Sequence, residues 1–84
     1  MSLEQFNDAA ERVKSLSSRP SNDDLLQLYA LFKQGSVGDV AGKRPGMLDI
    51  KGRAKYDAWA TKKGMSKDDA QAKYVALVDR LSGK

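Results

Sequence analysis

Apolar residues near the start of the chain recur at spacings of three and four, which is the spacing of one face of an α-helix. That face would consist of Leu3, Phe6, Ala10, Val13 and Leu16. Ser2 and Gln5 stand at its start in a capping-box pattern. The run Ser-Ser-Arg-Pro at 17–20 ends the periodicity, because a proline disfavours helical backbone at the residue before it. We therefore predict a first helix that ends before Pro20.

A second predicted helix follows Pro20 and is apolar around most of its circumference. Ser21 and Asp24 form another capping pattern at its start. Its apolar residues occupy two adjoining faces and are Leu25, Leu26, Leu28, Tyr29, Ala30, Leu31 and Phe32. A helix of this kind is typical of the centre of a bundle.

A segment without clear periodicity, 35–47, separates the second helix from the third. It is rich in residues that break helices, namely Gly35, Gly38, Gly42, Pro45 and Gly46. A connection of about thirteen residues is long for a compact domain, and such loops often carry function. A third helix is predicted to begin near Asp49 and to end at Lys62-Lys63-Gly64, where cations and a glycine are typical of a helix end. Its apolar positions are Ile50, Ala54 and Ala58.

A fourth helix is predicted from a third capping pattern, Ser66 with Asp69, and it ends at Gly83. Its apolar face consists of Ala70, Tyr74, Leu77, Val78 and Leu81. No stretch shows the two-residue alternation of a strand. The pattern therefore predicts one all-α domain over residues 1–84, a small four-helix bundle with a long loop between the second and third helices. The short links predict that helices one and two, and three and four, are antiparallel neighbours, whereas the long loop leaves helices two and three parallel.

The composition narrows the range of functions. The chain contains neither cysteine nor histidine, and its carboxylates never stand at the spacing of a calcium loop, so we predict no metal site and no cofactor. No nucleophile, base and orienting group stand at a recognisable spacing, so we predict no enzymatic activity. The start of the chain lacks a signal-peptide pattern, and the longest apolar run is far too short to span a membrane. We expect a cytoplasmic monomer with no stable membrane insertion.

The net charge of +4 is unevenly distributed. Residues 43–67 carry eight cations against two anions, whereas the rest of the chain carries seven cations and nine anions. A cationic segment on a slightly acidic body favours an anionic partner that is bound at one place.

Several residues in and near this segment each allow two interpretations. Lys51 and Lys55 are four residues apart, so on a helix they form either a solvated face or a clamp for one phosphate-rich anion. Tyr29 and Phe32 are typical of a core, yet Lys33 ends their face with a charge, as a ligand with apolar and phosphate parts would require. The remaining candidates, for which a core or surface role is the simpler interpretation, are Lys14, Trp59 and Tyr74.

Two longer stretches are more specific than any of these pairs. LYALFKQGSVGDV at 28–40 and RPGMLDIKGRAKYDAW at 44–59 resemble the acyl-CoA-binding protein family, and the similarity runs from about Phe6 to Leu81. The resemblance implies a four-helix bundle that binds long-chain acyl-coenzyme A thioesters non-covalently. It also implies an intracellular carrier and buffer of this ligand that performs no catalysis.

The resemblance further implies which residues contact acyl-coenzyme A, namely Lys14, Tyr29, Ala30, Leu31, Phe32, Lys33, Lys51, Lys55 and Tyr74. In the family's pattern, Lys33 and Lys55 hold the ribose 3′-phosphate together with the hydroxyls of Tyr29 and Tyr74. The ring at position 32 stacks on the adenine, and Lys14 and Lys51 border the ligand. Side chains expected to line an acyl groove are Ala10, Leu26 and Ala54.

The chain departs from the family's pattern at four places. Phe32 stands where tyrosine is common, and Tyr56 stands where a larger ring is common. Gly35 replaces a common alanine and is expected to loosen the end of the second helix. The stretch Ala41-Gly42-Lys43 makes the loop more flexible and more basic than usual. None of these changes removes an expected phosphate contact.

Two alternatives from other functional classes remain at this stage. The cationic segment with interleaved aromatics would suit a small nucleic-acid-binding module, although no helix-turn-helix spacing is visible and we predict no nucleic-acid partner. A purely structural bundle would bind no small ligand at all. Salt dependence, dependence on acyl-chain length and a co-purifying ligand mass distinguish the three.

Overall fold

The computed structural model describes residues 3–83 and contains four α-helices and no strand within that range. They are α1 (Leu3–Arg12), α2 (Asn22–Ser36), α3 (Ile50–Ala60) and α4 (Lys67–Leu81). A short 3₁₀ turn, η1 (Val13–Ser15), extends α1. The predicted all-α class and the long connection between the second and third helices are confirmed.

Side-chain caps fix the starts of three helices. Ser21 Oγ accepts a hydrogen bond from the Asp24 amide at 3.1 Å, and Ser66 Oγ accepts one from the Asp69 amide at 3.0 Å, so both predicted caps are confirmed. Asp49 caps α3 by accepting the Gly52 amide hydrogen bond at 3.0 Å. The capping role expected of Ser2 lies outside the described residues.

The predicted end of the third helix is too late. α3 ends at Ala60, and residues 61–64 form turns. The Thr61 hydroxyl donates to the Ala58 carbonyl at 2.6 Å, a bond that competes with the helical pattern. Gly64 has a φ of +91°, a left-handed conformation that glycine adopts without steric cost and that turns the chain towards α4.

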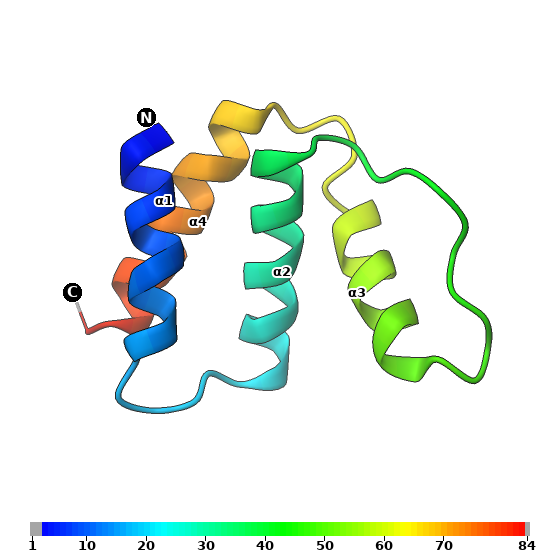
Figure 1. The fold of residues 1–84 in the computed structure, drawn as a ribbon, viewed down its shortest axis with the longest axis horizontal. Coiled ribbons are helices and arrows are strands. Elements are labelled where there is room, and N and C mark those ends of the chain that lie inside the picture. The colour runs from blue at the N-terminus through cyan, green and yellow to red at the C-terminus, as the bar shows by residue number, and fades with distance from the viewer. Residues whose placement is uncertain (1–2, 84) are drawn as a thin grey trace.

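The helices are arranged around α2, which packs against both α3 and α4, while α1 packs against α4 (Figure 1). α2 and α3 run in the same direction, as the loop length predicts, and α1 and α4 run in the opposite direction. The prediction that helices joined by short links are antiparallel is confirmed, but the prediction that they pack closely against each other is wrong. Within residues 3–83, α1 with α2 and α3 with α4 make few or no close backbone contacts. The reason is that the apolar face of α4 receives both α1 and α2.

The core lies where α1, α2 and α4 meet. Its buried residues are Phe6, Ala9, Leu28, Leu31, Tyr74 and Val78. Phe6 is at its centre, with ring centroids 5.4 Å from Phe32 and 5.3 Å from Tyr74. The predicted register of α1 is partly wrong, because Ala9 is buried while Leu3 is 61% exposed.

Trp59 is buried, as its core interpretation predicts, and joins α3 to the long loop. Its Nε1 donates to the Gly38 carbonyl at 2.8 Å. The buried aromatic ring and this hydrogen bond together hold the start of the loop against α3.

Two glutamines form a polar part of the core that the apolar pattern did not predict. Gln34 Nε2 donates to Asp39 Oδ1 and to the Met65 carbonyl, both at 2.8 Å. Gln71 Nε2 donates to the Gly35 carbonyl at 2.9 Å. These bonds join the end of α2 to the loop, to the α3–α4 turn and to α4.

Gly35 has a packing role that differs from the loosening expected from its sequence. It lies within α2, and a Cβ there would stand 3.0 Å from Gln71 Cγ and 3.1 Å from Phe6 Cζ. Glycine therefore allows α1 and α4 side chains to approach the α2 backbone closely.

Asp39 should make the fold sensitive to acid. The Gly64 amide and the Gln34 side chain both donate to it, and these hydrogen bonds lower the pKa of Asp39 below its usual 3.8. A depressed folded-state pKa contributes stability above the usual value, and this contribution is lost as the pH falls through the folded-state pKa. Between about pH 5 and pH 2, the wild type should lose more stability than Asp39→Asn, which cannot titrate. Thermal unfolding at each pH measures the difference. If the stability of the two proteins fell equally with pH, Asp39 would not cause the acid sensitivity.

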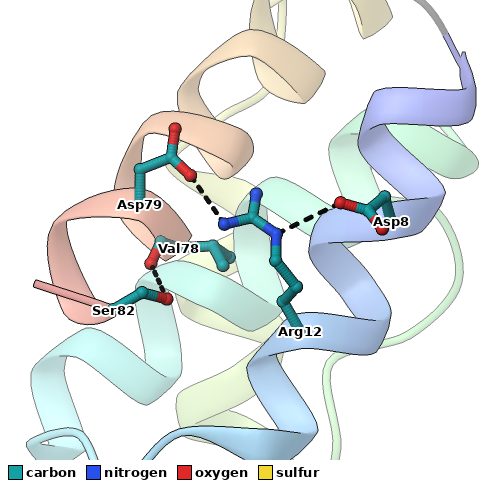
Figure 2. A network of polar contacts seen from close by, with 5 residues as sticks. All are labelled: Asp8, Arg12, Val78, Asp79 and Ser82. Atoms are coloured by element: carbon teal, nitrogen blue, oxygen red, sulfur yellow. Dashed lines mark hydrogen bonds and ion pairs between the residues drawn. The ribbon is translucent and has the colours of Figure 1, made fainter. Parts of the chain in front are cut away.

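Ion pairs add contacts between helices at the surface. Figure 2 shows Arg12, which contacts Asp79 on α4 at 2.7 Å and Asp8 one turn earlier on α1 at 3.2 Å. Next to it, the Ser82 hydroxyl donates to the Val78 carbonyl at 2.8 Å at the end of α4. Ion pairs at or near the surface contribute little to stability, so the fold depends mainly on the aromatic core.

Candidate ligand-binding site

The first hollow, the α1–α2 groove, lies between the two helices that the short link joins. It has a volume of about 710 Å³. Its apolar lining includes Ala10, Val13, Leu25, Leu28 and Phe32. Lys14 and Glu11 lie along it, and Tyr29 and Tyr74 contribute aromatic rings. This groove exists because both α1 and α2 pack on α4 and leave the space between them open.

The second hollow, the α2–α3 groove, lies on the other side of α2 and has a volume of about 460 Å³. Its apolar lining consists of Leu25, Leu26, Ile50 and Ala54. Its cations are Arg19, Lys51 and Lys55. The two grooves share Leu25 and Tyr29, so they meet along one face of α2.

Tyr29 stands where the grooves meet, and Lys55 contacts it. The Lys55 ammonium lies 5.6 Å from the centre of the Tyr29 ring, within the range of a cation–π contact. Within residues 3–83, neither Lys51 nor Lys55 has a carboxylate partner. Two uncompensated charges on one helix face are mildly unfavourable, and a bound anion would relieve their repulsion.

Tyr74 and Phe32 connect the α1–α2 groove to the core. Burial raises the pKa of Tyr74 above its usual value of 10.0, so its hydroxyl is protonated at neutral pH and can donate a hydrogen bond. No side chain or carbonyl within residues 3–83 is hydrogen-bonded to this hydroxyl. Phe32 is 37% exposed, and its free face can stack on a flat ligand ring.

Three of the predicted contact residues line neither groove. Lys33 is half-buried, and its ammonium lies 5.1 Å from the centre of the Trp59 ring. Ala30 and Leu31 are buried in the interior. The other six predicted contacts line the grooves, and so do the three predicted acyl-groove residues, Ala10, Leu26 and Ala54.

The comparisons with known proteins identify the family. The family model described as "Acyl CoA binding protein" matches residues 3–78, which is nearly the whole chain. The chain belongs to the acyl-CoA-binding protein family. It is 62% identical to acyl-CoA-binding protein homolog 1 of Caenorhabditis elegans over 94% of this chain and 92% of that protein. It is 57% identical to the acyl-CoA-binding protein homolog of Drosophila melanogaster over 100% of this chain and 98% of that protein.

Solved structures place the fold in the same family. The crystal structure of Oryza sativa acyl-CoA-binding protein 2 matches with a TM-score of 0.89 at 45% identity, covering 93% of this chain and 85% of that one. The family assignment therefore rests on sequence and on backbone geometry together.

Several groove residues of this acyl-CoA-binding protein family member were missed by the sequence analysis. Arg19 lies in the link before Pro20, and both line a groove. The motif Ser-Ser-Arg-Pro was interpreted only as the end of a helix. The arginine within it was the one feature that could have indicated a residue of the binding site. Leu28 and Ile50 were predicted as helix-face residues, and nothing in their spacing distinguished a groove from a core.

Proposed function

We propose that this protein binds long-chain acyl-coenzyme A esters reversibly in the two grooves, without performing chemistry on them. One observation carries the proposal: an apolar lining is combined with three cations in the α2–α3 groove and with Lys14 in the α1–α2 groove, and the two grooves meet at Tyr29. Acyl-coenzyme A is itself phosphate-rich at one end and a lipid at the other. The names of the family and of the related proteins support the same ligand.

The nucleotide end is proposed to occupy the α1–α2 groove. The exposed face of Phe32 stacks on the adenine, and Lys14 borders this part of the ligand. Lys55 and the hydroxyls of Tyr29 and Tyr74 bind the ribose phosphate near the point where the grooves meet.

Lys33 reaches this phosphate only if its side chain moves. It lies one helical turn after Tyr29 on α2, so a change of rotamer brings its ammonium from the Trp59 ring towards the same phosphate. Ala30 and Leu31 support this face of α2 from the interior, and we do not propose that their side chains contact the ligand.

The acyl chain is proposed to lie in the α2–α3 groove, over Leu26 and Ala54 and next to Ile50. Lys51 contacts the part of the ligand between the phosphates and the thioester. Reversible binding in open grooves releases the ester unchanged, which suits a carrier and buffer. We further propose that the protein acts as a cytoplasmic monomer.

Affinity should rise with acyl-chain length. Each buried methylene contributes about 0.8 kcal/mol, so two further carbons should tighten binding roughly tenfold until the groove is filled. Titration calorimetry with octanoyl-, dodecanoyl- and hexadecanoyl-coenzyme A should show this trend. The dissociation constant for the longest chain should be about 1 μM or lower, which corresponds to about −8 kcal/mol. Free coenzyme A should bind far more weakly.

A flat affinity across the series would contradict the proposal. A steep dependence on salt with no dependence on chain length would favour a nucleic-acid-binding module instead. Native mass spectrometry of the freshly purified protein adds an independent result, because a co-purifying mass should match an acyl-coenzyme A.

A further inference from the structure

Three large apolar side chains are exposed together where the long loop meets α3. Met47 is 80% exposed, Leu48 is 100% exposed and Ile50 is 77% exposed. We call residues 47–50 the apolar corner. Figure 1 shows this segment at the end of the molecule farthest from α1 and α4. Single exposed apolar side chains are common on protein surfaces, whereas neighbouring ones indicate a contact surface.

Cations flank the apolar corner along the chain, and the two anions of this segment are already engaged. Lys43, Lys51 and Lys55 are exposed and have no carboxylate partner within residues 3–83. Asp49 accepts the amide hydrogen bond that caps α3, and Asp57 pairs with Arg44 at 2.7 Å. This end of the protein therefore presents apolar side chains within a positively charged surface.

We propose that the apolar corner docks on membranes that carry anionic lipids. Leu48 and Met47 enter the boundary between headgroups and acyl chains, and the neighbouring lysines contact the anionic headgroups. A nucleic acid would attract the lysines but offers no apolar layer for Leu48. The contact is peripheral and reversible, since no helix within residues 3–83 is long and apolar enough to cross a membrane.

The position of the apolar corner links docking to the ligand grooves. Ile50 belongs to the corner and also lines the α2–α3 groove. Docking therefore places the mouth of that groove at the lipid surface, where an acyl chain can pass between groove and bilayer. This consequence rests on the proposed function, whereas docking itself depends only on residues 43–55.

Vesicle binding tests the proposal. The full-length protein is titrated with vesicles of phosphatidylcholine alone and of a phosphatidylcholine–phosphatidylserine mixture, and the bound fraction is measured by sedimentation. The wild type should bind the mixed vesicles, and the double variant M47S/L48S should bind them at least about tenfold more weakly. The matched control Leu3→Ser replaces an exposed leucine of α1, the helix at the opposite end of the molecule, and should bind like the wild type.

Several results would overturn the proposal. The first is no binding of the wild type to the mixed vesicles, and the second is equal binding by M47S/L48S and the wild type. The third is a wild type that binds no vesicles but forms dimers in ultracentrifugation, with M47S/L48S remaining monomeric. Titration of the same variants with octanoyl-coenzyme A separates the two proposals. M47S/L48S should retain wild-type affinity for this soluble ester, because neither residue lines a groove.

Discussion

Replacing Phe6 by alanine should lower the free energy of unfolding by about 4 kcal/mol. Phe6 is only 2% exposed, and its ring contacts both Phe32 and Tyr74. Its Cζ also lies close to the α2 backbone at Gly35, so alanine would leave a cavity between α1 and α2. A domain of this size has a total stability of about 5 kcal/mol, so the variant should be close to unfolding at room temperature.

Urea unfolding followed by circular dichroism and by Trp59 fluorescence measures this loss. Phe32→Ala is the matched control, because Phe32 belongs to the same aromatic cluster but is partly exposed. It should cost only about 1.5 kcal/mol of stability, while weakening the binding of the nucleotide end. Equal stability losses in the two variants would show that the core is not centred on Phe6.

Replacing Lys55 by alanine should weaken the binding of hexadecanoyl-coenzyme A by about 2 kcal/mol, or roughly thirtyfold. Its ammonium lies over the Tyr29 ring at the junction of the two grooves, where the proposal places the ribose phosphate. Charge-assisted hydrogen bonds to phosphate are about twice as strong as neutral ones. Lys33→Ala should have a similar effect if its side chain leaves the Trp59 ring on binding.

Calorimetry on both variants measures these losses, and Lys73→Ala on α4 is the control. Lys73 is an exposed lysine that lines neither groove, so its removal changes the net charge equally without touching the site. If Lys73→Ala weakened binding as much as Lys55→Ala, the effect would come from the overall charge. The proposed contact between Lys55 and the ribose phosphate would then be wrong.

Much of the fold follows from local sequence signals. The caps at Ser21 and Ser66 and the apolar face of α4 are short-range features, and the structure confirms them. Packing partners depend on long-range contacts, which helical spacing does not encode. The spacing therefore favoured Leu3 over Ala9 on the buried face of α1, and the loop lengths favoured wrong neighbours.

The buried glutamines show a second limit of the sequence pattern. Gln34 and Gln71 interrupt apolar faces, so binary patterning assigns them to the surface. In the structure they satisfy the carbonyl groups of Met65 and Gly35, which approach the core where elements meet. Such a role is visible only once the backbones are placed together.

For the candidate site, the sequence indicated the chemical type of the side chains, but not where each side chain lies. Lys51 and Lys55 were identified by their charge and spacing and Lys14 by the family resemblance, and all three line grooves. Lys33 has the same chemistry, yet its ammonium packs on Trp59. A lysine has four rotatable side-chain bonds, so helical position alone could not decide between the Trp59 ring and the groove.

Mapping the ligand by two-dimensional nuclear magnetic resonance tests most directly whether the two grooves form one site. Hexadecanoyl-coenzyme A is added to ¹⁵N-labelled protein, and amide shifts are compared with those caused by free coenzyme A. The ester should shift amides around both grooves, including Lys14, Phe32 and Ala54, and free coenzyme A should affect mainly the α1–α2 groove. Shifts confined to the separate hollow beside Ser15, Ser17 and Ser82, with both grooves unaffected, would contradict the account.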